Sequence, residues 1–549
     1  MNDAKRFTAG VWVFLCIGFF LLRAQSFIAE NSATFDEAVH LTAGYSYWER
    51  GQFAMNREHP PLSKLIAAFP MFVLEHPRFE PKADIAEPES QWSVGNDFVF
   101  RNSIPAREMI AWGRRSGLPL SIAFILLVGH WTSRRWGPVA GCLAVGLAST
   151  EPNLLAIGCT INSDMALTLF LFASAYCSWE YFQCGANRWS LRAGVAVGLA
   201  LASKYSSLFF LPGLLACWWF CRPALPRADE GGNRGKFGRI FRLALIAGLT
   251  LLPCYFFAHF PQYGAGLKQQ ISRNSFEPPA YYLDGEISSS GWYGYFLRIL
   301  FLKVSVLYWI ALAVSAYFFW RRRNLERNDL FLILPGLGYF AWLSVLKVDL
   351  GVRIVLPVLP FVILFACAMP MVPLRGATAG GAAFAALFMG WSFANSLNCR
   401  GEELTAASEY LSLRDANGRW ERFGDSNLDW GQDLLRLREW LADRNRPAIY
   451  LAYVGTAPPE FYGIDNIPLP GWGRVERRST KDERRADYAA ISVSCLQGLH
   501  LKDRAMYRDF LQYEPVSRLG GAIWIYDIRD KPALRDTIER LAEQVRNGK

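Results

Sequence analysis

Apolar residues in this chain gather into long runs that short polar stretches interrupt. A bilayer core of about 30 Å needs roughly 20 apolar residues per helix, so such runs are typical of membrane-crossing segments. We expect the first, residues 8–29, to be a retained helix, because no small-residue cleavage site follows it and Arg23 interrupts it. Eleven runs are expected to cross the membrane: residues 8–29, 116–133, 137–150, 163–182, 191–203, 205–221, 241–259, 292–319, 329–346, 353–370 and 376–396.

The pattern changes after about residue 397. Helical periodicity extends from Asp429 to Asp443, and a charged helix is expected from Ala533. Three short β-rich runs lie at residues 448–455, 488–494 and 522–528. We therefore predict a membrane domain over residues 1–397 and a soluble α/β domain over residues 398–549. The second domain has no glycine-rich nucleotide loop and nothing that looks independently catalytic.

Composition supports this division. The chain is 52% hydrophobic and 19% charged, against about 25% charged in soluble domains. Of its 106 charged residues, 48 follow Cys399. These values exclude disordered, fibrous and small disulfide-framework proteins. The net charge of +10 is compatible with nucleic-acid binding, but the arginines occur in short clusters between apolar runs, so no nucleic-acid partner is expected.

Lysine and arginine in the short loops predict the orientation. A cytoplasmic N-terminus places these basic positions inside: Lys5 and Arg6, Arg134 and Arg135, Arg188, the run from Arg222 to Arg242, and Arg321, Arg322 and Arg323. The alternate loops are poor in such residues, apart from the long first loop over residues 30–115. Eleven crossings then leave the C-terminal domain outside the cytoplasmic (inner) membrane, in the periplasm of a Gram-negative cell.

The eleven cysteines form no CxxC pair and no zinc-binding spacing. Most lie inside apolar runs, where a thiol behaves as a small hydrophobic group. Only Cys399 and Cys495 belong to the polar C-terminal part. An oxidising compartment would allow these two to pair, although nothing in the sequence shows that they are close.

The first outer loop carries the densest group of reactive side chains, between residues 34 and 64. Asp36 and His40 are four residues apart and would share one helical face, whereas Glu37 would point elsewhere. His59-Pro60-Pro61 predicts a rigid extended corner that presents His59 and then Lys64. A carboxylate here can act as a general base, and histidine or lysine can hold a phosphate. The alternative is a solvated loop with an amphipathic helix on the membrane surface.

Further charged residues are expected on the same side of the membrane. Asp164 lies at the outer mouth of a predicted helix, where an ionisable group is functional or serves as the N-cap. Arg115, Lys204 and Arg353 can together hold a phosphate head group. Taken singly, each cation can equally be an interfacial anchor.

Several of these segments resemble a known family. The stretches DEAVHLTAGYSYWERGQFAMNREHPPLSK, SDMALTLFLF, GLALASKYSSLFFLP and GVRIVLPVLP look like bacterial GT-C glycosyltransferases of family 39, which are related to protein O-mannosyltransferases and lipid A aminoarabinose transferases. GDSNLDWGQDLLRLREW and YLAYVGTAPPEFYGI resemble the C-terminal domain of many bacterial members. The resemblance implies a polytopic α-helical GT-C fold of about eleven spans, N-terminus inside and C-terminus outside.

The resemblance also implies roles for individual residues. The catalytic candidates are Asp36 with Glu37 beside it, and Asp164 is the second acid. The donor-phosphate candidates are Arg115, Lys204, Arg353, His59 and Lys64, and the substrate loop includes His40, Asn56 and Glu58. Related bacterial sequences often have histidine where this chain has Ile157, so acceptor or sugar contacts there are expected to differ.

The implied function is transfer of a hexosyl or pentosyl group from a polyprenyl-monophosphate carrier to a protein, lipid or glycan acceptor, in contact with membrane lipids. No cofactor is expected; the alternative is a divalent metal at Asp36, His40, Glu58 and His59. A transporter or flippase for a lipid-linked substrate is a second hypothesis, and an inactive scaffold for envelope assembly is a third. The acids flank helices at one surface and no internal repeat is visible, which favours the enzyme over the transporter.

Overall fold

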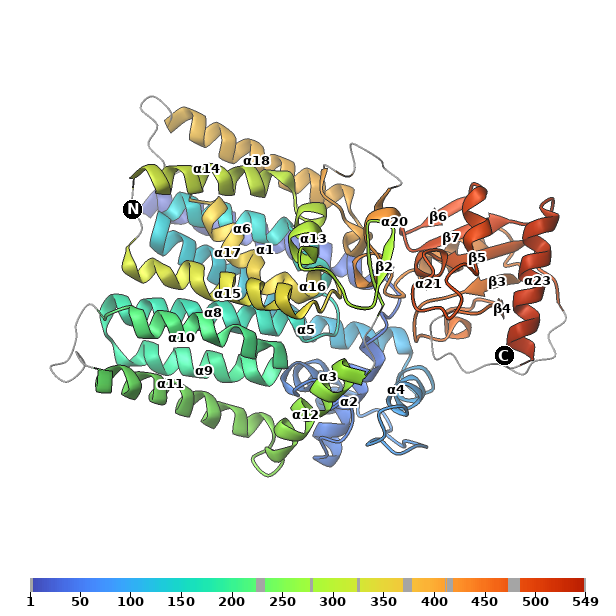
Figure 1. Cartoon of the computed structure of the whole chain (residues 1–549), viewed down its shortest axis with the longest axis horizontal. Helices are drawn as coiled ribbons and strands as arrows, with labels where there is room; N and C mark the ends of the chain where they lie inside the picture. The colour runs from blue at the N-terminus through green and yellow to red at the C-terminus, as the bar shows by residue number, and fades with distance from the viewer. Residues whose placement is uncertain are drawn as a thin grey trace.

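The computed structural model describes residues 3–223, 233–276, 280–322, 326–368, 378–409, 411, 418–471 and 484–547. Long helices lie side by side in a roughly parallel bundle, and a small sheet domain lies at one end of it (Figure 1). The N-terminus lies at the other end of the bundle (Figure 1). The mostly helical architecture and the small α/β domain are as predicted.

The expected apolar runs fall on helices of the bundle. These are α1 (Asp3–Glu30), α5 (Ala106–Trp136), α6 (Pro138–Thr150), α7 (Pro152–Gly158), α8 (Asp164–Cys184), α9 (Asn187–Ser203), η1 (Tyr205–Phe209), α10 (Leu211–Phe220), α11 (Asn233–Cys254), α13 (Tyr295–Lys303), α14 (Val306–Arg322), η2 (Arg327–Asp329), α15 (Leu330–Leu346), α16 (Val352–Val355), η3 (Leu356–Val358), α17 (Leu359–Ala366) and α18 (Thr378–Asn398). Among the described residues, four helices are long and apolar enough to cross a membrane, or six when each of two bent pairs counts as one span.

In each bent pair, one largely apolar stretch of the sequence forms two helices that meet at an angle. The axes of α6 and α7 differ by 61°, and those of α13 and α14 by 113°. Glu151 separates the first pair in an extended conformation, as expected before a proline, and its side chain accepts a hydrogen bond from the backbone N–H of Leu154. The break turns α7 and leads the chain into the loop that precedes α8.

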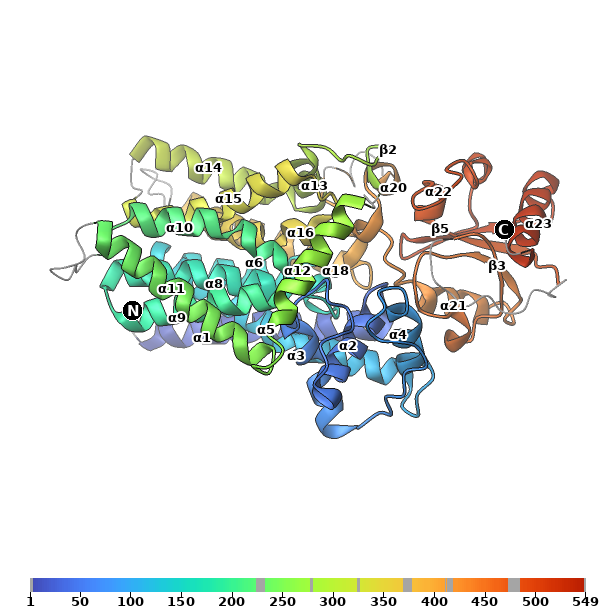
Figure 2. The same ribbon diagram turned by 60° about the horizontal axis from the view of Figure 1, so that its bottom comes forward.

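The segment predicted to be the first outer loop forms a compact helical layer near the sheet domain (Figure 2); we keep the name first outer loop for it. It contains α2 (Glu37–Arg50), α3 (Leu62–Leu74) and α4 (Gln91–Phe100), which gather at the end of the bundle near the sheet domain (Figure 2). All residues of α2 from Glu37 to Tyr47 are buried. The alternative of a solvated loop with an amphipathic surface helix is therefore wrong. Later in the chain, α12 (Pro261–Phe276) and the hairpin β1 (Tyr281–Leu283) and β2 (Glu286–Ser288) precede α13.

The C-terminal domain is built on a five-stranded sheet in the order β4-β3-β5-β7-β6. Strand β3 is parallel to β4 and β5, whereas β7 is antiparallel to β5 and β6. The three predicted strands correspond to β3, β5 and β7, and the two edge strands were not predicted. Its elements are α20 (Arg419–Arg422), α21 (Leu434–Ala442), β3 (Ile449–Ala452), β4 (Asn466–Pro468), β5 (Tyr488–Ser492), α22 (Val493–Leu496), β6 (Ser517–Leu519), β7 (Ile523–Asp527) and α23 (Pro532–Arg546), with short 3₁₀ turns η5 (Glu403–Thr405), η6 (Asp425–Asn427), η7 (Pro459–Tyr462) and η8 (Arg508–Gln512).

The sheet domain shares a hydrophobic core with the first outer loop. Leu41 of α2 and Phe98 of α4 belong to the same buried cluster as Leu434 of α21 and Leu451 of β3. Burial of apolar side chains is the main stabilising contribution to such an interface. The C-terminal domain is therefore packed firmly onto the loop that carries the predicted catalytic motif.

One predicted basic cluster, Arg134 and Arg135, meets acidic partners at helix ends. At the end of α5, Arg134 lies 3.0 Å from Glu180 of α8, and Arg135 lies 2.7 Å from Asp329, which precedes α15. Part of the Arg222–Arg242 run, residues 224–232, lies outside the described residues, as does Arg323.

Candidate active site

Asp36 lies between the end of α1 and the start of α2. It occupies the N-cap position of α2, yet its carboxylate makes no capping hydrogen bond. Instead, Oδ2 of Asp36 lies 3.3 Å from Nη1 of Arg353. The Asp36 side chain keeps 24% of its surface exposed, so the carboxylate is within reach of a substrate.

Arg353 lies in α16, directly after a backbone turn that glycine makes possible. The φ angle of Gly351 is 94°, in the region that favours glycine. A guanidinium has five N–H donors, and the buried Nε of Arg353 has no hydrogen-bond partner among the described residues. The carboxylates of Asp36, Asp164 and Asp425 are close enough to stabilise its positive charge. An unpartnered buried donor of this kind suits an anionic oxygen from a ligand.

Asp164 and Lys204 form the second acid–base pair. Nζ of Lys204 lies 2.5 Å from Oδ1 of Asp164, and the two side chains are 13% and 2% exposed. Asp164 is the first residue of α8, and its own backbone N–H is capped by Oδ1 of Asn162 at 2.7 Å. The alternative role of Asp164 as the N-cap is therefore wrong. Lys204 lies in the extended break between α9 and η1, and its ammonium contacts Asp164.

Glu37 is buried in a network of hydrogen bonds that stabilises the loop. This environment does not fit the catalytic role that was expected for Glu37. Its carboxylate accepts two hydrogen bonds from Arg114, at 2.8 and 2.6 Å, and both side chains are almost completely buried. It also accepts the backbone N–H groups of Thr34 and Ile161. Burial acts to raise the pKa of Glu37, but Arg114 and these donors outweigh it, and the pKa is lowered. With its oxygens fully engaged, Glu37 fixes the loop and takes no acceptor proton.

Arg115, which we expected at the donor phosphate, is exposed on α5. The preceding residue, Arg114, is the buried one and pairs with Glu37. One residue turns a helix by about 100°, so neighbouring arginines face different surroundings. The structure does not bring Arg115 into the group formed by Asp36, Asp164, Lys204 and Arg353.

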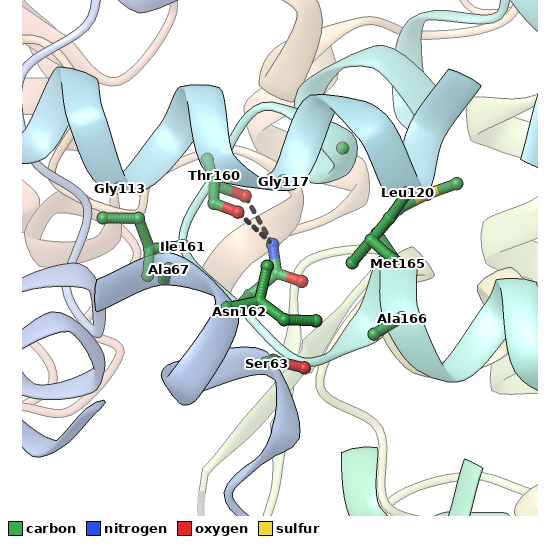
Figure 3. A pocket seen from close by; sticks show the side chains of 12 residues that line it. Ser63, Ala67, Gly113, Gly117, Leu120, Thr160, Ile161, Asn162, Met165 and Ala166 are labelled. Carbon is green, nitrogen blue, oxygen red and sulfur yellow. Dashed lines mark hydrogen bonds between the residues drawn. The ribbon is translucent and has the colours of Figure 1, made fainter. Parts of the chain in front are cut away.

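The short loop before α8 contacts Glu37 and His40 of α2 through the backbone of Ile161. Figure 3 shows residues Thr160 to Asn162 beside α5, with the Asn162 side chain bonded back to Thr160. The backbone N–H of Ile161 donates to Glu37, and its carbonyl oxygen lies 3.1 Å from Nδ1 of His40. A pocket of about 20 Å³ lies beside this loop, room for one water molecule. It is lined by Ser63, Ile66, Ala67, Gly113, Gly117, Leu120, Gly158, Thr160, Ile161, Asn162, Met165 and Ala166.

The two histidines of the first outer loop lie together. The rings of His40 and His59 pack edge to face, with centroids 5.3 Å apart. Burial lowers the pKa of His40, although nearby Asp36 opposes the shift. Burial also lowers the pKa of His59 well below its usual value, and the charges of His40, Lys204, Lys64 and Arg353 add to this effect. A neutral His59 among cations can donate one hydrogen bond to a phosphate oxygen.

All three N–H donors of the Lys64 ammonium bind the surrounding loop, so none is free for a phosphate. The prediction that Lys64 binds the donor phosphate is therefore wrong. Its Nζ donates to the hydroxyl of Tyr47 at 2.8 Å and to the backbone oxygens of Asn56 and His59 at 2.7 and 2.8 Å. Burial lowers the pKa of Lys64 to about 7. Asn56, with a φ angle of 51°, donates to Glu58 at 3.2 Å. The predicted substrate-loop residues Asn56 and Glu58 are thus buried and support the corner at His59.

Metal binding and a disulfide are two further possibilities that the sequence raises. Within the described ranges, no group of three or more His, Cys, Asp and Glu side chains is placed to hold a metal ion. All eleven cysteines are free, so Cys399 and Cys495 are not paired in this structure. Cys495 is buried in the sheet domain, and Cys399 follows α18.

The C-terminal domain contributes residues that sequence reasoning missed. The ring of Trp430 lies 4.5 Å from the guanidinium of Arg353. Asp425 lies 3.5 Å from Nε2 of His500, and its charge acts on Arg353. The signal was present in DSNLDWGQD, where polar and acidic residues crowd around one tryptophan just before a helix.

Part of the chain is similar to a known protein family. Residues 13–264 match the dolichyl-phosphate-mannose-protein mannosyltransferase family. This stretch includes Asp36, Asp164 and Lys204, whereas Arg353 and the sheet domain lie beyond it. The match confirms the resemblance to glycosyltransferases related to protein O-mannosyltransferases. No curated protein matches the sequence significantly.

A comparison with solved structures finds several similar chains. ArnT from Cupriavidus metallidurans in the apo state is 12% identical with a TM-score of 0.51, over 94% of this chain and 98% of that chain. ArnT from the same organism bound to undecaprenyl phosphate is 11% identical with a TM-score of 0.49, over 95% and 98%. The Saccharomyces cerevisiae protein O-mannosyltransferase Pmt1-Pmt2 complex bound to the sugar donor is 19% identical with a TM-score of 0.33, over 50% and 38%. The apo ArnT match shows that the two chains share the GT-C fold.

Proposed function

We propose that this chain, whose residues 13–264 match the dolichyl-phosphate-mannose-protein mannosyltransferase family, is a membrane glycosyltransferase. It transfers a sugar from a polyprenyl-monophosphate carrier to a protein, lipid or glycan acceptor. The observation that carries the proposal is the partly exposed carboxylate of Asp36 beside Arg353, whose buried Nε has no partner among the described residues. The family match supports the class of donor.

The chemistry is a direct displacement at the anomeric carbon. The acceptor oxygen forms a bond to that carbon while the bond from the carbon to the carrier phosphate breaks. The acceptor proton passes to Asp36, which acts as the general base. The released carrier is a phosphate monoester and needs no proton at neutral pH. Arg353 and Lys204 stabilise the negative charge that grows on the phosphate as the bond breaks.

The proposed site lies on the outer face of the cytoplasmic (inner) membrane. This placement follows from eleven crossings, a cytoplasmic N-terminus and an external sheet domain. Two observations support it. The N-terminus and the sheet domain lie at opposite ends of the bundle (Figure 1). Arg134 and Arg135 end the α5 helix, which begins beside the first outer loop, and basic loops favour the cytoplasmic side.

The test is a transfer assay with the purified full-length chain in sealed liposomes. A panel of polyprenyl-phosphate sugars is supplied with membrane extract as acceptor, and released polyprenyl phosphate and sugar-labelled products are measured. Release that depends on both the chain and one donor supports the proposal. Movement of the donor across the bilayer without release indicates a flippase, and neither activity indicates a scaffold.

Two additions to this assay define the substrate and the metal requirement. Mass spectrometry of the envelope from a deletion strain identifies the sugar and the acceptor by the mass that is lost. EDTA is expected to change the rate less than about twofold, because the proposed base and phosphate ligands are side chains. A loss with EDTA that Mg²⁺ or Mn²⁺ restores would assign a divalent metal to the reaction.

A further inference from the structure

One segment of the C-terminal domain contacts both halves of the proposed site. We name residues Asp425–Asp433 the bridging segment; it has the sequence DSNLDWGQD and precedes α21. The two parts it touches, the loop into α2 and the turn into α16, are more than 300 residues apart in the chain. Asp36 and Arg353, which face each other at the site, belong to these two parts.

The bridging segment first pairs with the loop that leads to Asp36. The carbonyl oxygen of Trp430 accepts the backbone N–H of Phe35 at 2.9 Å, and that of Gln432 accepts the backbone N–H of Ser32 at 2.9 Å. The hydroxyl of Ser32 donates to the carbonyl oxygen of Gly431 at 3.0 Å. These hydrogen bonds fix the backbone of the residue directly before Asp36.

The same segment then holds the turn that carries Arg353. Oδ1 of Asn427 accepts the backbone N–H of Val352 at 2.8 Å. The ring of Trp430 lies 4.5 Å from the Arg353 guanidinium, a contact that stabilises a cation electrostatically. Trp430 therefore contacts the loop of the base through its backbone and the phosphate-binding arginine through its ring.

Backbone and side-chain bonds make the bridging segment rigid. Oε1 of Gln432 accepts the backbone N–H of Trp430 at 2.8 Å, and Nε2 of Gln432 donates to the carbonyl oxygen of Leu428 at 2.9 Å. Asp425 has a φ angle of 54°, and its partner His500 has a φ angle of 63°. Non-glycine residues in this region are strained and cluster at functional sites.

We infer that the bridging segment is part of the active site and sets the position of Asp36 relative to Arg353, with Trp430 as a positioning residue for Arg353. The inference rests on the proposed function and assigns a role to the C-terminal domain. That domain completes the catalytic unit instead of serving only as a separate acceptor-binding module. Small changes of geometry matter here, because a misplacement of 1 Å can lower a rate about 10²-fold.

The main test compares two tryptophans of the same domain. Trp430→Ala is expected to lower kcat about tenfold or more, whereas Trp430→Phe keeps an aromatic face for Arg353 and stays within about threefold. Trp440→Ala is the matched control, because Trp440 also packs on an arginine, Arg444, at 4.0 Å, away from the site. Equal activity of Trp430→Ala and Trp440→Ala would overturn the inference.

Two milder variants keep the inference testable if Trp430→Ala does not fold. Ser426→Ala removes one hydrogen bond, from its hydroxyl to the carbonyl oxygen of Leu350 at 3.0 Å. Thr456→Val removes one hydrogen bond, from its hydroxyl to the carbonyl oxygen of Phe35 at 2.7 Å. Each is expected to lower kcat severalfold while donor binding changes less. Thr456 lies outside the bridging segment, in the same domain, so it is a comparison only; unchanged kcat in a folded Ser426→Ala variant contradicts the inference.

A readout without substrate separates this inference from the proposed function. In amide hydrogen exchange, Trp430→Ala is expected to speed exchange at Ser32 and Phe35, whereas Trp440→Ala leaves it unchanged. Unaltered exchange at both amides would show that the segment does not hold the loop. If the wild-type chain transfers no sugar at all, the proposed function fails, and the exchange result still decides whether the segment fixes the loop.

Discussion

At the scale of single residues, burial assigns different roles to two adjacent carboxylates. Glu37 is enclosed by Arg114 and two backbone N–H groups. Asp36 stays partly exposed and faces Arg353. Removing one partner of a buried pair such as Glu37–Arg114 typically costs about 3–5 kcal/mol of stability. A loss of activity on changing Glu37 would therefore report on folding first.

The cations of the site are expected to act on the donor. Arg353→Ala and Lys204→Ala should each lower kcat and raise the KM for the polyprenyl-phosphate sugar about tenfold or more, with little change in the KM for the acceptor, because a charge-assisted hydrogen bond to phosphate is lost. Steady-state kinetics with each substrate varied in turn measures this difference. Arg101→Ala is the control, since Arg101 pairs with Asp97 on the same outer loop. Equal effects on both substrates would assign the cations to general stability.

The sequence predicts which charged residues lie on one side of the membrane, but it does not predict where each side chain points. The sequence placed Asp36, Asp164, Lys204 and Arg353 on one side of the membrane, and the structure pairs them. Arg115 was wrongly predicted to bind the donor phosphate, whereas the neighbouring Arg114 is the buried arginine. Loop composition does not show which face of a helix is buried. The three donor bonds of Lys64 to Tyr47, Asn56 and His59 depend on a loop conformation that no local pattern indicates.

At the scale of elements, apolar runs predicted helices well and breaks poorly. The run at residues 292–319 contains α13 and α14 at a sharp angle, since an apolar run has the same appearance whether straight or bent. Strands β4 and β6 have three residues each, too short for an alternating pattern to emerge. Long, strongly patterned elements were therefore predictable, and short ones fixed by tertiary contacts were not.

The bridging segment also predicts how stability depends on pH. Burial raises the pKa of Asp429 to about 7, and the charge of Asp433 adds to this effect. The folded chain then holds a proton that the unfolded chain has lost between about pH 4 and pH 7. Stability should therefore fall as the pH rises through this range, by on the order of 4 kcal/mol for an isolated group.

Thermal unfolding of the purified chain at pH 5 and pH 8 measures this dependence. The wild type should melt at a lower temperature at pH 8, and Asp429→Asn should reduce the difference, because its amide stays neutral. Asp443→Asn, an exposed residue of the same domain, is the control. A wild-type chain that is equally stable or more stable at pH 8 would contradict the proposed protonation of Asp429.

At the scale of the whole molecule, the account requires the sheet domain and the first outer loop on one face of the membrane. Fusions after residue 400 should be active with alkaline phosphatase and dark with a cytoplasmic fluorescent protein. Control fusions at Gly185, between α8 and α9, should show the opposite pattern. Reversal at residue 400 would place the sheet domain in the cytoplasm and make the number of crossings even.

The most direct test of the account is the rate of sugar transfer by Asp36→Asn. The substitution keeps the shape of the side chain and removes the base, so kcat should fall by about 10²–10⁴-fold. Asp97→Asn, which alters a carboxylate–arginine pair elsewhere on the first outer loop, should keep normal activity. An Asp36→Asn chain that is folded and within a few-fold of the wild type would show that Asp36 is not the base.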